Sequence, residues 1–441
     1  MPQNYSTYQS TSQTARQCKS VQFELNHDRW RTEHIAKIIM SLPGWCSLIA
    51  TICILLLVVS ASDDPWLQIN DEDPTLPVPD LISKYGYQVE RHTATTDDGY
   101  GLTMFRVLSQ QPVNSIKPPV LMMHGILGSA ADFVALGPNK SLAYLLADSG
   151  YDVWLMNSRG TLYSRYHTKL PLVSKAYWDF SWHEIGYYDL PSIIDYILDV
   201  TASEKVHCIG FSQGTTAYFV LTSTRPEYNE KVALMVAMAP SAFVQLIRSP
   251  IARIMIPMVE WLAKFMASHE VYGWLPASKV LHVLRNAICP LNYPENICSE
   301  FMDLLVGPHP EAYDPKVIAV HSGHTPAGGS FNQDVHYAQI ARSGLFQQYD
   351  FGREGNYRKY GSKDPPTYEL ERSTAPIALF YGLNDWLVHP RNVENLAKIL
   401  PRVVAVKPVA DKKFNHIDFL LARNVRELVY DEVIQMIEGY S

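Results

Sequence analysis

A five-residue turn, Gly-Phe-Ser-Gln-Gly at 210–214, restricts the fold of this chain more than any other segment. It follows a short apolar run, Val206–Gly210, and precedes a helical run, Thr215–Leu221. A strand that turns so sharply into a helix holds the central serine exposed in a strained conformation, and the flanking glycines leave room for the turn. The turn therefore predicts a buried strand, a helix packed on its sheet and a nucleophile at Ser212.

Short apolar runs alternate with helical stretches from Pro118 onward. This alternation is typical of a mostly parallel sheet with helices on both faces. A helix is predicted at Tyr187–Leu198, and the apolar runs that predict strands are Val120–Met123, Tyr151–Met156, Val206–Gly210, Val232–Met238 and Ile377–Gly382.

A long insertion interrupts this alternation of strands and helices. The 138 residues from Ala239 to Pro376 are far more than a connection inside a compact sheet needs. We therefore predict an inserted cap over about 241–372. Its first part, Phe243–Met266, carries apolar residues at helical spacing. Each of them alone fits an ordinary core-facing stripe, but a Met-rich, aromatic insert over a sheet suits a cavity for a flexible apolar ligand.

A serine nucleophile needs a histidine to take its proton and a carboxylate to orient that histidine. In folds of this class the chain order is Ser, then Asp or Glu, then His. Only His389 and His416 follow the last predicted strand, and His389 shares with Asp385 the loop directly after that strand. We therefore predict Ser212, Asp385 and His416 as the catalytic residues. Asp418 is the rival acid, but it lies two residues past His416 and is better placed for local pairing.

Backbone N–H groups must stabilise the charge that develops on a substrate oxygen. We expect one donor from Gln213, directly after the nucleophile, and one from Ile126, in the loop after Val120–Met123. No metal or cofactor is expected, because His183-Glu184 lacks the second histidine of a zinc helix and no phosphate-binding glycine motif opens a helix. The net charge of −7 and the lack of a basic stripe argue against a nucleic-acid partner.

The first 62 residues are predicted to be a disordered arm followed by a targeting segment, and residues 63–441 the catalytic domain. No charged side chain occurs from Ile38 to Ser62, and basic residues precede this run whereas acidic ones follow it. That asymmetry places the C-terminal side outside the cytosol.

The dense apolar stretch Leu48–Val59, followed by Ser-Ala-Ser, fits a cleaved secretory signal. A single-pass type II anchor is the alternative, but about 20 apolar residues are reached only by counting back through Pro43 and Gly44. Met40 is a candidate second start that would give a short conventional signal.

Cysteine pairing is open to a chain that enters an oxidising compartment. Cys289 and Cys298, nine positions apart, could close a short loop, whereas Cys208 is predicted to be a buried thiol in a strand. Asn139-Lys140-Ser141 is a glycosylation sequon that would face the lumen.

Several ordered blocks after residue 80 resemble the acid lipase family, which includes lysosomal acid lipase and gastric lipase. The blocks are Thr96–Tyr100, His124–Ala130, Ala147–Gly160, Trp178–Pro191, Gly210–Gly214, His324–Ser330, Asn384–Leu387 and Asn415–Phe419. One departure is Gly329, which stands where threonine is common in the family.

The resemblance implies an α/β-hydrolase with a helical cap and lid that acts on triacylglycerols or sterol esters at a lipid–water interface. It implies Ser212, Asp385 and His416 as triad, Ile126 and Gln213 as oxyanion donors, and a secreted or lysosomal location. A carboxylesterase or acyltransferase of the same fold, or an inactive binding protein, are the alternatives.

Overall fold

The computed structural model describes residues 72–109, 117–274 and 297–440, which belong to one compact unit, Pro65–Ser441. The predicted arm and signal or anchor segment at 1–62 lies outside the described residues. Among the helices of those three ranges, none is both long and apolar enough to span a bilayer.

A nine-stranded mixed sheet forms the centre of this unit, in the order β1-β2-β4-β3-β6-β7-β10-β11 with β5 beside β2. β1 and β2 form an antiparallel hairpin, β2 meets β4 antiparallel, and the strands from β4 to β11 run parallel. The strands are β1 Gln88–Thr95, β2 Tyr100–Leu108, β3 Lys117–Met123, β4 Tyr151–Met156, β5 Tyr166–His167, β6 Val206–Phe211, β7 Val232–Met238, β10 Ile377–Tyr381 and β11 Val403–Pro408.

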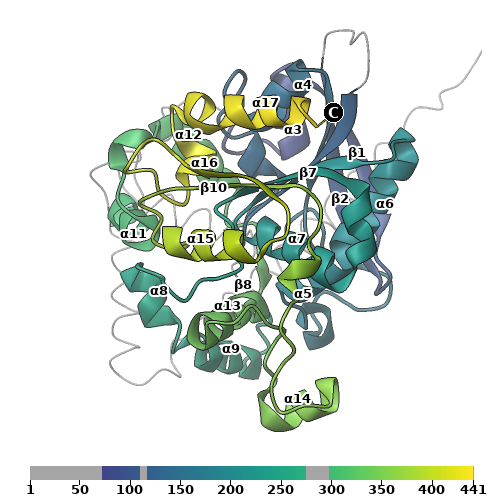
Figure 1. Cartoon of the computed structure of the whole chain (residues 1–441), viewed down its shortest axis with the longest axis vertical. Helices are drawn as coiled ribbons and strands as arrows, with labels where there is room; N and C mark the ends of the chain where they lie inside the picture. Colours follow the sequence, from purple (N-terminus) through teal and green to yellow (C-terminus); the bar gives the residue numbers. More distant parts are fainter. Residues whose placement is uncertain (1–71, 110–116, 275–296, 441) are drawn as a thin grey trace, which may run out of the picture. The chain divides into compact units, whose positions relative to one another are not determined.

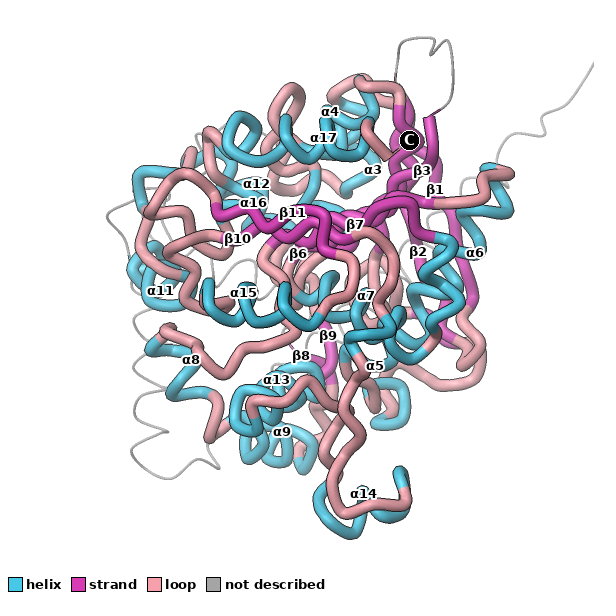
Figure 2. Tube along the Cα trace, viewed as in Figure 1, coloured by secondary structure: helices cyan, strands magenta, loops and turns pink. Residues whose placement is uncertain are grey.

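Helices cover both faces of the sheet (Figure 1). In Figure 2 the magenta strands run between two groups of helices. One face carries α3 Val78–Lys84, α4 Leu142–Asp148, α12 Pro315–His324, α16 Asp418–Leu421 and α17 Asp431–Glu438, and the other α6 Leu190–Thr201, α7 Gln213–Thr224 and α15 Pro390–Ile399. The mostly parallel sheet with helices on both faces, expected from the sequence, is therefore confirmed.

The central strands are apolar throughout because both of their faces are buried. Along β6, Ile209 and Phe211 pack into the core on one side of the sheet, whereas Val206 and Cys208 pack into the core on the other side. Successive side chains of a strand point to opposite faces, so one short run serves two cores.

The segment between β7 and β10 is helical where the structure describes it. It contains α8 Pro250–Met255, α9 Val259–Ser268, α11 Ile297–Val306, α13 Phe331–Ser343 and α14 Gly352–Tyr360, together with α12 and the two-stranded sheet of β8 Gly273–Trp274 and β9 Gly329–Ser330. In Figures 1 and 2, α8, α9, α13 and α14 lie beyond the α7 and α15 side of the sheet.

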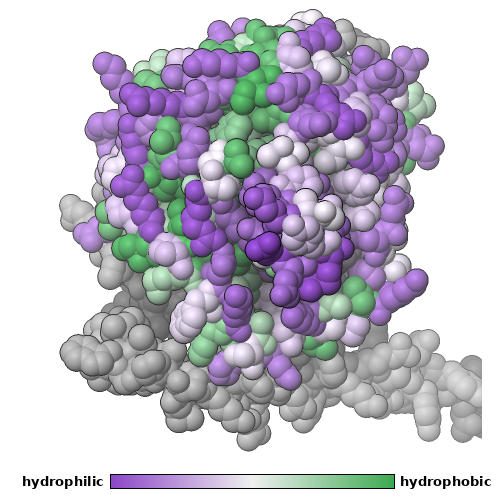
Figure 3. Space-filling view, turned by 60° about the horizontal axis from the view of Figure 1, so that its bottom comes forward, coloured by the Kyte–Doolittle hydropathy of each residue, from purple (hydrophilic) through white to green (hydrophobic). Residues whose placement is uncertain are grey.

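The helical periodicity of Phe243–Met266 is divided between two helices. Pro250 opens α8, and Pro257 lies between α8 and α9, where its missing N–H and its ring break the helix. Ile254 and Met258 are exposed, so this stripe does not simply face a core. Figure 3 likewise shows hydrophobic residues reaching the surface among hydrophilic ones on the face that it draws.

Candidate active site

Ser212 lies between the end of β6 and the start of α7. Its backbone adopts φ 49° and ψ −115°, a conformation that costs a non-glycine residue roughly 1–3 kcal/mol and persists only when the surroundings impose it. Its N–H donates to the carbonyl of Met238 at the end of β7 at 3.0 Å. The strand, the helix and the neighbouring strand together hold the hydroxyl at the carboxyl edge of the sheet.

Three glycines make this turn sterically feasible. A Cβ at Gly214 would overlap the backbone of Met123 in β3, and one at Gly210 would lie 2.9 Å from the Met235 side chain. A Cβ at Gly125 would lie 3.0 Å from the Phe211 ring. The loop after β3, the turn and helix α7 are therefore packed against one another with no room for a methyl group.

His416 bridges Ser212 and Asp385. Its Nε2 lies 2.9 Å from the Ser212 hydroxyl and its Nδ1 2.8 Å from Asp385 Oδ2. Asp385, fully buried in the loop after β10, also accepts hydrogen bonds from the N–H groups of Leu387 and Val388 at 2.9 and 2.7 Å. The structure thus brings together three residues that the chain order predicted, in the geometry that a Ser-His-Asp relay requires.

The two rival residues lie elsewhere. His389 caps the N-terminus of α15, where its Nδ1 accepts a hydrogen bond from the Arg391 N–H at 3.1 Å. Asp418 accepts a hydrogen bond from the Asn415 N–H at 2.7 Å and pairs with His309 at 2.7 Å. Asp418 therefore supports the loop that carries His416 rather than the imidazole itself.

The two predicted oxyanion donors lie in the turn after Ser212 and in the loop after β3. Gln213 is the first residue of α7, so its N–H has no carbonyl one turn earlier in the helix to bond. Ile126 lies in the loop after β3, next to the tightly packed Gly125.

His124 holds the Ile126 loop in place. Its Nε2 accepts a hydrogen bond from the Ser158 N–H at 3.1 Å, so its Nδ1 carries the proton and donates to the Gly125 carbonyl at 2.8 Å. Burial lowers the pKa of His124, which keeps the ring neutral in this role.

Gln333 of α13 connects the inserted segment to Gln213. Its Nε2 donates to the Gln213 side-chain oxygen at 2.9 Å, and its Oε1 accepts a hydrogen bond from the Ser330 N–H at 2.8 Å. Both glutamines are buried. A Cβ at Gly329 would overlap Oε1 of Gln333, so the departure from threonine at 329 makes room for this bridge.

A buried ion network is centred on Arg159. The Arg159 guanidinium pairs with Asp189 at 2.6 Å and Asp98 at 2.6 Å, and lies 4.0 Å from the ring centre of Tyr100. Burial opposes the ionisation of Asp98, but the hydrogen bonds and charge of Arg159 outweigh it and lower the pKa of this carboxyl. Three separate blocks of the sequence thus meet at one guanidinium.

The remaining predicted sites are only partly described. Asn139 is exposed and adopts φ 63°. Cys298 is disulfide-bonded, and Cys289, its expected partner, lies outside the described residues. Cys208 is a buried free thiol. No group of three or more His, Cys, Asp or Glu side chains in the described ranges could hold a metal ion.

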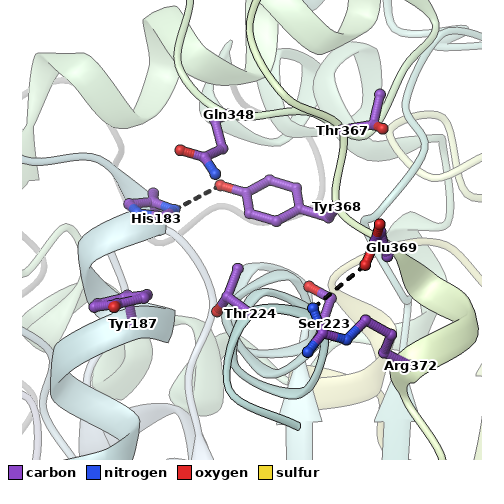
Figure 4. Close-up of a pocket in the computed structure, with 9 residues that line it drawn as sticks. All are labelled: His183, Tyr187, Ser223, Thr224, Gln348, Thr367, Tyr368, Glu369 and Arg372. Atoms are coloured by element: carbon purple, nitrogen blue, oxygen red, sulfur yellow. Dashed lines mark hydrogen bonds and ion pairs between the residues drawn. The ribbon is translucent and has the colours of Figure 1, made fainter. Parts of the chain in front are cut away.

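A cleft of about 370 Å³ lies at the other end of α7, away from Ser212 (Figure 4). Ser223 and Thr224, at the C-terminal end of the helix, form one wall. Across the cleft, His183 Nδ1 and the Tyr368 hydroxyl are hydrogen-bonded at 2.8 Å. Every residue that lines it carries a polar or charged group, Glu369 and Arg372 among them, so this cleft does not suit an acyl chain.

Comparisons with known proteins identify the relatives of this chain. Residues 78–137 match a family model described as a partial alpha/beta-hydrolase lipase region, and residues 118–269 match the alpha/beta hydrolase fold. The chain is 40% identical to Lipase 1 of Drosophila melanogaster, over 83% of this chain and 80% of that protein. It is 34% identical to the gastric triacylglycerol lipase of Rattus norvegicus, over 83% of this chain and 93% of that protein.

Among solved structures, DcsB in complex with a substrate analogue matches with a TM-score of 0.50 and 12% identity. The match covers 80% of this chain and all of that one. At this level of identity the likeness concerns the fold alone.

Proposed function

The chain belongs to the acid lipase family of α/β-hydrolases, and from this premise we propose that it cleaves triacylglycerols or sterol esters to free fatty acids. The observation that carries the proposal is the hydrogen-bonded series from Ser212 through His416 to Asp385, at 2.9 and 2.8 Å.

In the proposed reaction, Ser212 Oγ attacks the ester carbonyl while its proton passes to His416 Nε2. His416 then gives this proton to the leaving alcohol, and an acyl-enzyme remains. Water attacks the acyl-enzyme, again losing its proton to His416, which returns it to Ser212 as the fatty acid departs. Asp385 holds the ring so that Nε2 faces the serine, and stabilises its positive charge.

The backbone N–H groups of Gln213 and Ile126 are the proposed oxyanion donors. Preorganised donors of this kind typically contribute about 100- to 1,000-fold to the rate because they stabilise charge that exists only in the transition state. The hydrogen bonds of His124 and Gln333 hold both donor segments without direct contact with substrate.

We also propose that residues 241–372 form the cap over the acyl chain. Helices between β7 and β10 and the bridge from Gln333 to Gln213 support this assignment. The partner would be a lipid ester at a lipid–water interface.

Replacing Ser212 by alanine tests the enzymatic assignment. We expect purified Ser212→Ala to lose at least about 1,000-fold in hydrolysis of emulsified triolein while keeping the wild-type melting temperature. Exposed Ser362→Ala serves as the matched control. Full activity of Ser212→Ala would mean that the chain is not a serine hydrolase.

A chain-length series separates a lipase from a carboxylesterase of the same fold. A lipase hydrolyses emulsified triolein or cholesteryl oleate faster than dissolved short-chain esters, and a carboxylesterase does the reverse. Adding an alcohol acceptor identifies an acyltransferase, because ester then forms in place of free acid.

For localisation, we propose entry into the secretory pathway through residues 1–62, with cleavage after the apolar stretch and delivery outside the cell or to the lysosome. A type II anchor is the alternative. The exposure of Asn139 supports glycosylation there. N-terminal sequencing of protein recovered from culture medium tests cleavage, and residues before Ser60 in that protein would contradict it.

A further inference from the structure

The loop 161–178 after β4, here called the rim loop, differs in charge from the rest of the chain. It contains Arg165, Lys169 and Lys175 but no aspartate or glutamate, although the whole chain carries a net charge of −7. Lys169 and Lys175 are exposed, and neither forms an ion pair within the described parts of the chain. Two uncompensated cations on an acidic protein favour an anionic partner.

Apolar side chains are exposed beside these cations. Val173 is 69% exposed, Tyr166 62%, Leu162 43% and Leu172 38%. Single exposed apolar residues are ordinary, but four within twelve residues of one loop, among cations, are the composition of a surface that meets lipid.

Hydrogen bonds hold the rim loop in one conformation. The buried Trp178 indole donates to the Leu172 carbonyl at 2.8 Å, which ties the backbone of an exposed residue to the core. His167 accepts the N–H groups of Lys169 and Leu170 on Nδ1, both at 2.9 Å, and donates from Nε2 to the Asp98 carbonyl at 2.9 Å. The exposed groups are therefore preorganised, which lowers the entropy that docking would cost.

The rim loop lies beside the candidate active site. The Leu162 N–H donates to the Ala327 carbonyl at 3.0 Å, and the Ala327 N–H donates to the Leu127 carbonyl at 2.7 Å. Leu127 is next to Ile126, the proposed oxyanion donor. Two backbone hydrogen bonds thus connect the exposed loop to the segment that would receive the ester.

From this juxtaposition we propose that the rim loop docks the enzyme onto a lipid surface that contains anionic phospholipid, with Leu172 and Val173 entering the surface and Lys169 and Lys175 binding its phosphate groups. The inference rests on the proposed lipase function, since docking here would bring the site to its substrate. A droplet coated with anionic phospholipid would then be attacked faster than one coated with neutral phospholipid.

Vesicle cosedimentation tests the charge component. All proteins carry Ser212→Ala, so that binding is measured without hydrolysis, and the vesicles are phosphatidylcholine with or without phosphatidylserine. Each lysine near an anionic surface contributes about fivefold, so Lys169→Gln with Lys175→Gln should weaken binding to the anionic vesicles about 25-fold. Binding to neutral vesicles should not change.

The matched charge control is Lys205→Gln with Lys398→Gln. Both lysines are exposed; Lys205 precedes β6 and Lys398 lies in the last turn of α15, so both lie toward the amino edge of the sheet. This pair should bind as the parent does. Equal losses in the two pairs would overturn the proposal, because they would reflect net charge alone.

The apolar component has its own pair of variants. Leu172→Ser with Val173→Ser should weaken binding to both vesicle types on the order of tenfold or more, whereas Val404→Ser with Val406→Ser, exposed valines on β11, should not. Unchanged binding of the 172–173 variant would also overturn the proposal.

Turnover separates this inference from the proposed function. With Ser212 restored, the rim-loop variants should hydrolyse a dissolved ester at the parent rate, which also shows that they fold. The lysine variant should lose activity only on emulsions containing anionic phospholipid, whereas the 172–173 variant should lose activity on neutral and anionic emulsions alike. Loss on the dissolved ester would contradict docking, whereas a parent that cleaves no emulsified ester at all would contradict the lipase function instead.

Discussion

Arg159 is a buried cation whose charge is balanced by two carboxylates. It is 1% exposed and faces two carboxylates, one of which, Asp189, is fully buried. Removing one partner of a buried pair leaves an uncompensated charge, which typically costs about 3–5 kcal/mol. We therefore expect Arg159→Met to lower the free energy of unfolding by about that amount, measured in urea. Exposed Arg372→Met, which breaks a surface pair with Glu369, should change it by less than about 1 kcal/mol.

Gln333 is a positioning residue, because its side chain contacts Gln213 and not the substrate. Gln333→Leu would leave the buried Gln213 side-chain oxygen without its partner, a loss of about 1–3 kcal/mol. If the bridge holds the Gln213 N–H in place, kcat on a dissolved ester should fall about tenfold while KM stays constant. Gln333→Glu would still accept the Ser330 N–H, but it could donate to the Gln213 side-chain oxygen only when protonated. The leucine variant, whose effect does not depend on pH, is therefore the sharper test. An unchanged kcat with lower stability would make Gln333 purely structural.

At the scale of elements, the contact between α7 and β3 sets the position of the nucleophile. Gly214→Ala places a methyl group against the Met123 backbone and must move the helix away from the strand. A displacement of about 1 Å can cost on the order of 100-fold in rate, so we expect kcat/KM to fall at least that far. Gly439→Ala, whose Cβ would meet nothing closer than 3.5 Å, should leave kcat/KM unchanged.

Elements with a local signal could be predicted from the sequence. Tyr151–Met156 and Val232–Met238 are the strands β4 and β7 as expected, because a strand buried on both faces is a continuous apolar run. The hairpin of β1 and β2 was not foreseen, since most side chains of β1 are partly or fully exposed and the strand lacks such a run.

Other features depend on packing that periodicity does not encode. The helix predicted from Tyr187 begins as α6 at Leu190, after a π-helical turn at Ile185–Asp189 that ends at the carboxylate facing Arg159. The chain order indicated Ser212, Asp385 and His416, but nothing local marks Gln333, because its contact with Gln213 spans 120 residues.

At the scale of the whole molecule, buried histidines have opposite effects on how stability depends on pH. Burial lowers the pKa of His207 to about 4 and that of His336 to about 3. The unfolded chain protonates these rings below about pH 6.5 whereas the folded chain does not, so they destabilise the fold as pH falls from 6.5. His309 acts in the other direction. Burial opposes the charge of the His309 ring, but the hydrogen bond and charge of Asp418 outweigh burial and raise its pKa. The stability that His309 contributes is therefore lost as pH rises above 6.5.

Asp334 in α13 gives the clearest prediction at this scale. Its Oδ2 atom is buried and accepts no hydrogen bond from the described residues, and burial raises its pKa to about 7. The folded chain keeps this proton up to about pH 7, whereas the unfolded chain releases it near pH 4. Ionisable Asp334 therefore destabilises the fold progressively from about pH 4 to 7, by on the order of 4 kcal/mol at most.

Asp334→Asn removes this ionisation and keeps the shape of the side chain. We expect its melting temperature to exceed that of the parent at pH 8 and to equal it at pH 4, as measured by calorimetry in matched buffers. Asp80→Asn, an exposed acid in the first turn of α3, should produce no such gain at pH 8, because it loses a favourable interaction with the helix dipole. A gain for Asp334→Asn that is equal at both pH values would show that packing, and not the buried charge, limits stability at this position.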